Sequence, residues 1–297
     1  MRHKTADLDG PVHYIDFGGD GPPLVMVHGL GGSALNWMAI GSEIAKSYHA
    51  VALDLAGFGQ TPLFHRSAAV GANAELVHSF IETVIGGPVA IMGNSMGGHI
   101  AVLEAAVHPT WVNTMILVDP AIPGIHVRRP EPARLGVMAA MTIPGLAETL
   151  LDRRVRVLGP EGLVLQTLDL VCADPSRVAT QVVEAHIKLM RERDKLGRQN
   201  ARAFLQASRS IGFRMADPRF WSRVAKVKAP TLVVHGSLDR LIPVAAARQL
   251  IRRRPDWTLE ILEGVGHVPM MEAPQEFIHA INGWPAYRIA REPAAIS

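Results

Sequence analysis

Gly93-Asn-Ser-Met-Gly-Gly98 is the stretch that decides the fold. It follows the apolar run 88–92 and precedes a helix-like run, 98–107. A serine on a tight turn between a strand and a helix leaves little room for neighbouring side chains, so glycines at positions 93 and 97 suit such a turn. The hydroxyl of Ser95 then projects into the open. We predict from this pattern that Ser95 is a catalytic nucleophile.

Two later motifs supply the partners that a nucleophilic serine needs. Asp239 lies in a polar loop after the apolar run 231–235, and His267 lies in a glycine-containing loop after the run 259–262. Side chains just beyond the carboxyl ends of parallel strands gather at one edge of a sheet. We predict a triad in which His267 accepts the proton of Ser95 and Asp239 orients the histidine.

A fourth motif, Leu24-Val-Met-Val-His-Gly-Leu-Gly-Gly-Ser33, joins an apolar run to a glycine-rich turn. Such a turn can aim a backbone N–H group at the negative charge that develops on a carbonyl oxygen. We predict that the amides of Leu30 and Met96 form the oxyanion hole. His28 is expected to brace this turn and is a candidate to line the pocket.

With these four elements in this order, the chain resembles the α/β-hydrolase family, in its branch with a serine nucleophile and a lid. The stretch Asp54-Leu-Ala-Gly-Phe-Gly-Gln-Thr61 is similar to the family's loop beside the oxyanion turn. The apolar runs near residues 12, 24, 50, 88, 115, 231 and 258 predict strands, and their alternation with helical stretches predicts a mostly parallel central sheet with helices on both faces. We expect 1–121 and 229–297 to form this core and 122–228 to form a helical cap.

Asp119 is the alternative acid, because it ends the apolar run 115–118 and some family members take their acid from that position. Asp239, which is followed by Arg240 and a proline, matches the more common pattern. Asn94 and Val268, each next to a predicted triad residue, are pocket candidates. The cap adds Met138 and Met141, whose flexible side chains suit acyl or alkyl groups.

Composition excludes several other classes of protein. Of the 297 residues, 48% are hydrophobic and 19% are charged, which argues for a large core and against disorder. The single cysteine, Cys172, rules out an internal disulfide and a zinc site made of cysteines. We find no signal peptide and no uninterrupted apolar run of about 18 residues, so we expect a cytoplasmic protein without a transmembrane segment. We expect no metal or organic cofactor.

The excess of positive charge is concentrated in the predicted cap. Residues 122–228 carry 19 Lys and Arg against 10 Asp and Glu, whereas the chain as a whole has a net charge of +3. Acidic residues alternate with basic ones in the stretch 190–195, which favours a solvated helical surface over an anion-binding one. No nucleic-acid motif accompanies the charge.

The serine at the elbow argues against haloalkane dehalogenases and epoxide hydrolases, which resemble this fold but use aspartate there. We expect a serine hydrolase that cleaves carboxylic esters of small to medium apolar substrates through an acyl-enzyme. Asn94 also resembles the elbow of C–C bond hydrolases of aromatic ring-fission products, the 2-hydroxy-6-oxo-dienoate type. Those enzymes typically have tryptophan after the catalytic histidine, where Val268 stands, and a longer oxyanion turn. An acyltransferase and a non-catalytic ligand receptor are further alternatives, and the oligomeric state stays open.

Overall fold

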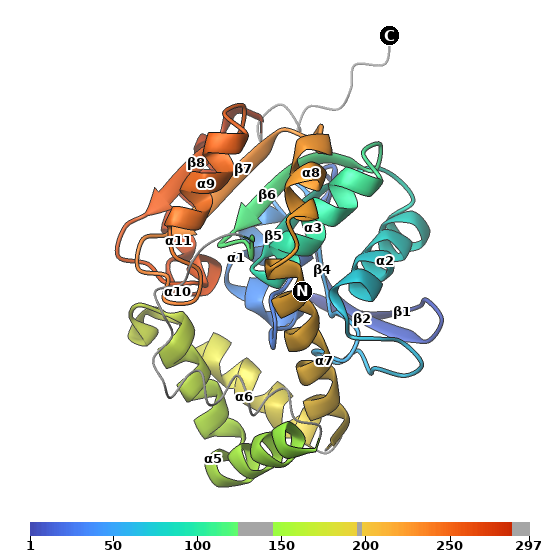
Figure 1. Cartoon of the computed structure of the whole chain (residues 1–297), viewed down its shortest axis with the longest axis vertical. Helices are drawn as coiled ribbons and strands as arrows, with labels where there is room; N and C mark the ends of the chain where they lie inside the picture. Colours follow the sequence, from blue (N-terminus) through green and yellow to red (C-terminus); the bar gives the residue numbers. More distant parts are fainter. Residues whose placement is uncertain (124–144, 195–197, 287–297) are drawn as a thin grey trace.

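One sheet organises the chain. The computed structural model describes residues 1–123, 145–194 and 198–286. In these residues eight strands pair in the order β1-β2-β4-β3-β5-β6-β7-β8 (Figure 1). The strands are β1 (Arg2–Asp7), β2 (Pro11–Gly18), β3 (Pro23–Val27), β4 (His49–Leu53), β5 (Val89–Asn94), β6 (Val112–Val118), β7 (Thr231–Gly236) and β8 (Thr258–Leu262). The pairings from β4 through β3, β5, β6 and β7 to β8 are parallel. The strand β2 pairs antiparallel with both β1 and β4. The predicted fold class is confirmed.

The central strands are buried on both faces, which explains their apolar sequences. Every residue of β5 and β7 is buried, as expected for parallel strands covered by helices on both sides. The strand β1, in contrast, is mostly exposed and charged. It pairs along its whole length with β2, and its sequence lacks the apolar alternation that would have predicted it. Charged residues on such an edge discourage pairing with another chain.

Helices cover both faces of the sheet. On each face, a cluster of buried hydrophobic residues lies between the sheet and its helices. One face packs against α2 (Val70–Phe80), α3 (Met96–Val107), α8 (Arg219–Lys226) and α9 (Ala245–Arg253). The other packs against α1 (Met38–Ile44), α10 (Pro269–Glu272) and α11 (Pro274–Gly283), together with the short 3-10 helix η1 (Ala34–Trp37). The helix α2 continues into a π-helix, η2 (Ile81–Ile85).

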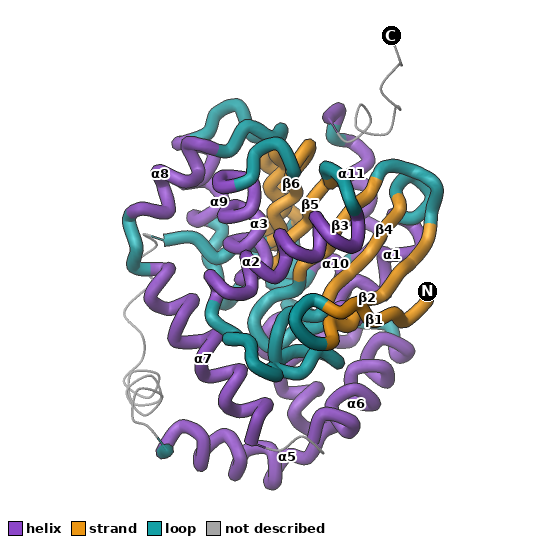
Figure 2. Tube along the Cα trace, turned by 90° about the vertical axis from the view of Figure 1, so that its right-hand side faces the viewer, coloured by secondary structure: helices purple, strands orange, loops and turns teal. Residues whose placement is uncertain are grey.

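Three long helices lie beyond the carboxyl ends of the strands and pack onto the core from there (Figure 1, Figure 2). They are α5 (Leu146–Val171), α6 (Thr180–Asp194) and α7 (Arg198–Met215), with a short 3-10 helix, η3 (Pro175–Arg177), between α5 and α6. The helix α8 also falls within 122–228, and its Phe220 and Val224 belong, like Ala203 and Ala207 of α7, to the buried cluster around α3. The division at residue 228 stays a prediction. Within the described residues, no helix is long and apolar enough to cross a membrane.

Candidate active site

Five neighbouring strands deliver the predicted site residues to one edge of the sheet. Leu30 follows β3, Ser95 follows β5, Asp119 follows β6, Asp239 follows β7 and His267 follows β8. These strands are consecutive in the sheet order. Residues 237 positions apart in the chain, from Leu30 to His267, are therefore gathered at the same carboxyl-terminal edge.

Ser95 occupies a strained turn between β5 and α3. Its backbone has φ 55° and ψ −115°, a conformation that costs a residue with a side chain about 1–3 kcal/mol. The turn is held because the Ser95 N–H donates to the carbonyl of Val118 at 2.9 Å and the Ser95 carbonyl accepts from the N–H of Ala121 at 3.0 Å. A Cβ atom on Gly93 would collide with the carbonyl of Gly97, and one on Gly97 would collide with the end of β3. The local sequence therefore fits this turn and little else.

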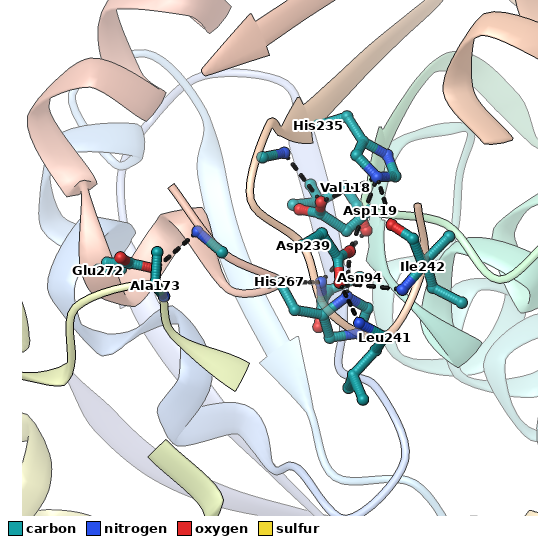
Figure 3. A network of polar contacts seen from close by, with 12 residues as sticks. Asn94, Val118, Asp119, Ala173, His235, Asp239, Leu241, Ile242, His267 and Glu272 are labelled. Carbon is teal, nitrogen blue, oxygen red and sulfur yellow. Dashed lines mark hydrogen bonds and ion pairs between the residues drawn. The ribbon is translucent and has the colours of Figure 1, made fainter. Parts of the chain in front are cut away.

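Asp239 and His267 form a short hydrogen bond. Nδ1 of His267 lies 2.6 Å from Oδ2 of Asp239 (Figure 3). The other carboxylate oxygen accepts from the N–H groups of Leu241 at 2.7 Å and Ile242 at 2.9 Å. Burial alone would raise the pKa of Asp239, but the hydrogen bond and charge of His267 lower that pKa below its usual value. The carboxylate is thus an ionised acceptor that fixes the orientation of the imidazole.

Asn94 links the nucleophile strand to the histidine loop. Its Nδ2 donates to the carbonyl of Val118 at 3.2 Å and to the carbonyl of His267 at 3.0 Å (Figure 3). The residue before Ser95 therefore sets the backbone position of His267. Val268, the next residue, is buried at the start of α10.

The glycine-rich turn after β3 packs directly against Ser95. The turn is closed by a hydrogen bond from the N–H of Gly32 to the carbonyl of Gly29 at 3.1 Å. A Cβ atom on Gly29 would lie 3.0 Å from Cβ of Ser95. Met96 is the first residue of α3, so its N–H has no acceptor within the helix. The two amides predicted for the oxyanion hole thus belong to segments that meet at Ser95.

His28 and Asp54 hold this turn from beneath. Nδ1 of His28 donates to the carbonyl of Gly29 at 2.7 Å, and Nε2 accepts from the N–H of Leu55 at 3.1 Å. His28 is fully buried, and burial lowers its pKa, so the ring is neutral. Asp54 accepts from the N–H of Ala34, just beyond the turn, at 2.7 Å. The geometry gives both residues a bracing role.

Asp119, the alternative acid, lies close to Asp239 but does not contact the histidine of the triad. Its Oδ1 accepts from the N–H of Gly236 at 2.9 Å, and among the described residues no N–H or O–H group donates to its Oδ2. His235 lies between the two acids, with Nε2 3.5 Å from Asp119 and 3.7 Å from Asp239. Burial, and then the charge of Asp239, raise the pKa of Asp119 well above its usual value. The atoms of this trio lie close enough to hold a metal ion, but Asp239 is already bound to His267 and to two backbone amides.

Glu272 is a site residue that no sequence motif predicted. This buried carboxylate accepts from the N–H groups of Ala173 at 3.1 Å and Asp174 at 2.8 Å, which follow α5, and from the N–H of Gly266 at 2.8 Å (Figure 3). The N–H of His267 also donates to the last residue of α5 at 2.6 Å. Glu272 therefore joins the histidine loop to the end of α5. No local pattern in the sequence marks it.

A second joint ties α6 and α7 to the loops around the oxyanion turn. The guanidinium of Arg193 donates to the carbonyls of Gly57 and Gly59, and also to the side-chain oxygen of Asn200. The ring of Phe204 lies over the oxyanion turn, 3.3 Å from where a Cβ atom on Gly31 would be. The pocket candidates Met138 and Met141 lie outside the described residues.

Comparison with known proteins places this geometry in a family. The model of the alpha/beta hydrolase family matches residues 24–280. The chain is 29% identical over 266 residues to 2-hydroxy-6-oxo-6-(2'-aminophenyl)hexa-2,4-dienoic acid hydrolase of Metapseudomonas resinovorans, covering 88% of this chain and 83% of the relative. It is 26% identical over 282 residues to 2-hydroxy-6-oxononadienedioate/2-hydroxy-6-oxononatrienedioate hydrolase 2 of Pseudomonas putida, covering 93% of this chain and 92% of the relative.

A solved structure, a membrane phospholipase A described as a bacterial virulence factor, superposes with a TM-score of 0.74 at 27% identity, covering 98% of this chain and 87% of that one. The similarity thus extends over the sheet and over the helices α5, α6 and α7. The match to the family model spans the predicted nucleophile, acid and histidine. The chain belongs to the alpha/beta hydrolase family.

Proposed function

We propose that the chain is a serine hydrolase that cleaves carboxylic esters of small to medium apolar substrates. His267 removes the proton of Ser95, and the serine oxygen attacks the ester carbonyl while the amides of Leu30 and Met96 bind the oxyanion. His267 then protonates the departing alcohol, which leaves an acyl-enzyme. Water, deprotonated by the same histidine, attacks this intermediate and releases the acid and free Ser95.

The observation that carries this proposal is the 2.6 Å contact between Asp239 and His267, next to a serine on a strained elbow. Because Nδ1 of the imidazole faces the carboxylate, Nε2 is the nitrogen left to serve the serine. The hydrogen bond from Asn94 to the carbonyl of His267 ties the backbone of His267 to the residue before the proposed nucleophile. Both catalytic partners are thus supported by groups that do not react.

Two features favour an ester over a carboxylated dienone as substrate. Val268 puts a buried apolar side chain beside His267, where the C–C hydrolases typically carry tryptophan. Half-buried Arg193 in α6 already donates to two backbone carbonyls and a side-chain oxygen, so it does not offer a free guanidinium to a substrate carboxylate. Arg191 is exposed, 3.9 Å from Glu161. The similarity to a phospholipase A agrees with an ester substrate.

A C–C bond hydrolase is the second candidate. The curated relatives compared above are hydrolases of 2-hydroxy-6-oxo-dienoates, and Asn94 stands at the elbow as in that group. Such a substrate needs polar groups for its carboxylate and for ketonisation, in addition to the triad. The triad itself serves either reaction, so substrate comparison has to separate them.

The first test concerns the nucleophile. Ser95→Ala should abolish ester turnover and labelling by a fluorophosphonate probe, with a loss on the order of a million-fold if the triad acts as a unit. The melting temperature should not fall, because alanine is small enough for the strained turn and the substitution removes only a hydroxyl group. Substantial turnover by a purified variant that was expressed in a strain lacking other esterases would sink the assignment.

The second test ranks the substrates. Nitrophenyl esters of increasing chain length and a 2-hydroxy-6-oxo-dienoate should be compared by kcat/KM on the same preparation. We expect the esters to be preferred. A hundredfold preference for the dienoate, equivalent to about 2.7 kcal/mol of transition-state binding, would instead establish the C–C hydrolase.

A further inference from the structure

A cluster of metal-ligand type lies on α2 and α3, away from the triad. His78 is in the last turn of α2, Glu104 is near the end of α3, and His108 ends α3. The candidate ligand atoms of the three side chains all lie within 4.8 Å of one another. The two helices pack side by side on the same face of the sheet (Figure 1). The proposed reaction uses none of these three residues.

The ligand atoms of these side chains lie close together. Nδ1 of His78 lies 2.9 Å from Oε1 of Glu104, and the ring centroids of His78 and His108 are 3.5 Å apart and nearly parallel. Zinc bonds of about 2.0–2.2 Å in a tetrahedron put neighbouring ligand atoms roughly 3.3–3.6 Å apart. Because the in-plane lone pairs of parallel rings do not point at one atom, one of the two rings must turn out of the stack to share an ion with the other.

The buried carboxylate of the cluster also suits a cation. The side chain of Glu104 is only 1% exposed, and its ion-pair partner is the imidazole of His78, a much weaker base than lysine or arginine. A divalent ion held by Glu104 and the two imidazoles would compensate this buried carboxylate more fully than one imidazole does.

We propose that His78, Glu104 and His108 bind a divalent transition-metal ion, with Zn²⁺ as the best-fitting one. Two imidazoles and one carboxylate are a common zinc ligand set, and water supplies the fourth ligand. The ion ties the end of α3 to α2. Since α3 has 12 residues, the ion lies about 18 Å along the helix from Ser95. It therefore stabilises the fold and takes no part in ester cleavage.

The test uses the full chain without a histidine tag, stripped of metal with a chelator and then dialysed. Calorimetric titration with Zn²⁺ should give one site per chain, and saturating Zn²⁺ should raise the melting temperature by roughly 3 °C or more. His78→Ala and His108→Ala should each weaken binding at least about tenfold and remove the rise. Turnover of a nitrophenyl ester should be the same with and without zinc.

A matched control guards against binding elsewhere. His3 and His13 form another close pair, with ring nitrogens 2.9 Å apart, so His3→Ala removes a different contact between two histidines without touching α2 or α3. This variant should bind Zn²⁺ like the wild type. The proposal is overturned if the wild type binds no Zn²⁺ at 100-fold excess. It is equally overturned if binding survives both His78→Ala and His108→Ala, or is lost with His3→Ala instead.

Discussion

The ends of β6 and β7 each present one buried aspartate, and the pKa values of the two carboxyl groups are shifted in opposite directions. The side chains of Asp119 and Asp239 are both 0% exposed. Asp239 receives two backbone N–H groups and a histidine nitrogen, whereas Asp119 receives a single backbone N–H. The pKa of Asp239 is lowered and that of Asp119 is raised well above its usual value.

Hydrogen-bond donors around each carboxylate, and not the degree of burial, therefore decide which of the two is ionised. The backbone adds to the difference, because Asp119 has φ 44°, a conformation that few residues other than glycine, asparagine and aspartate adopt readily. Asp239, the predicted acid of the triad, is thus the carboxyl that the loop after β7 supplies with donors.

The largest expected effect comes from changing the two acids separately. Asp239→Asn should lower kcat/KM roughly ten-thousand-fold, because the amide favours the wrong tautomer of His267. Asp119→Asn should have little effect, since asparagine tolerates the backbone conformation. Ester hydrolysis by both purified variants at pH 8 measures the ranking. The reverse order would transfer the acid to Asp119.

Glu272 is a third buried carboxylate, and it lies where the loop that carries His267 meets the end of α5. Like Asp239 it is surrounded by N–H donors. In Glu272→Gln the amide nitrogen must face one of these donors, which displaces the loop that carries His267. A displacement of about 1 Å can lower kcat on the order of a hundredfold, and KM should change little because Glu272 does not touch the substrate.

The matched control for this variant is Glu276→Gln. Glu276 pairs with Arg177 at 2.6 Å and is largely exposed, so it also connects the core to the segment after α5. An exposed ion pair contributes about 0–1 kcal/mol, and this variant should retain wild-type kcat. Steady-state kinetics of both variants decide the point. A Glu272→Gln protein that melts earlier but keeps its kcat would reduce Glu272 to a purely stabilising role.

The predictable part of this molecule is the part in which chemistry and local sequence coincide. Ser95, Asp239 and His267 each follow an apolar run and lie near glycine, so a tight turn at a strand end could be inferred from a few adjacent residues. The close approach of Gly29 to Ser95 was likewise implicit in a glycine-rich turn. The fold class followed from the alternation of such runs with helical stretches.

What the sequence did not reveal depends on contacts between distant segments. Glu272 meets residues about a hundred positions earlier in the chain, and nothing in its own neighbourhood marks it. His78 and Glu104 come together only through the packing of α2 on α3. The charge state of Asp119 was also hidden, because a residue's type does not tell how many donors surround it.

The smallest effect concerns stability and follows from the sign of the Asp119 shift. The raised pKa means that the folded state binds more protons than the unfolded state at pH values between the usual pKa of aspartate and the raised value. The contribution of Asp119 to stability is therefore fully present below about pH 4 and is lost as the pH rises through the raised pKa. Asp119→Asn removes this dependence. The difference in unfolding free energy, variant minus wild type, should increase with pH, by at most about 1.4 kcal/mol per pH unit within that window. Denaturant titrations between pH 4 and 9 measure it, and a difference that stays flat or falls over this range would show that Asp119 is ionised like Asp239.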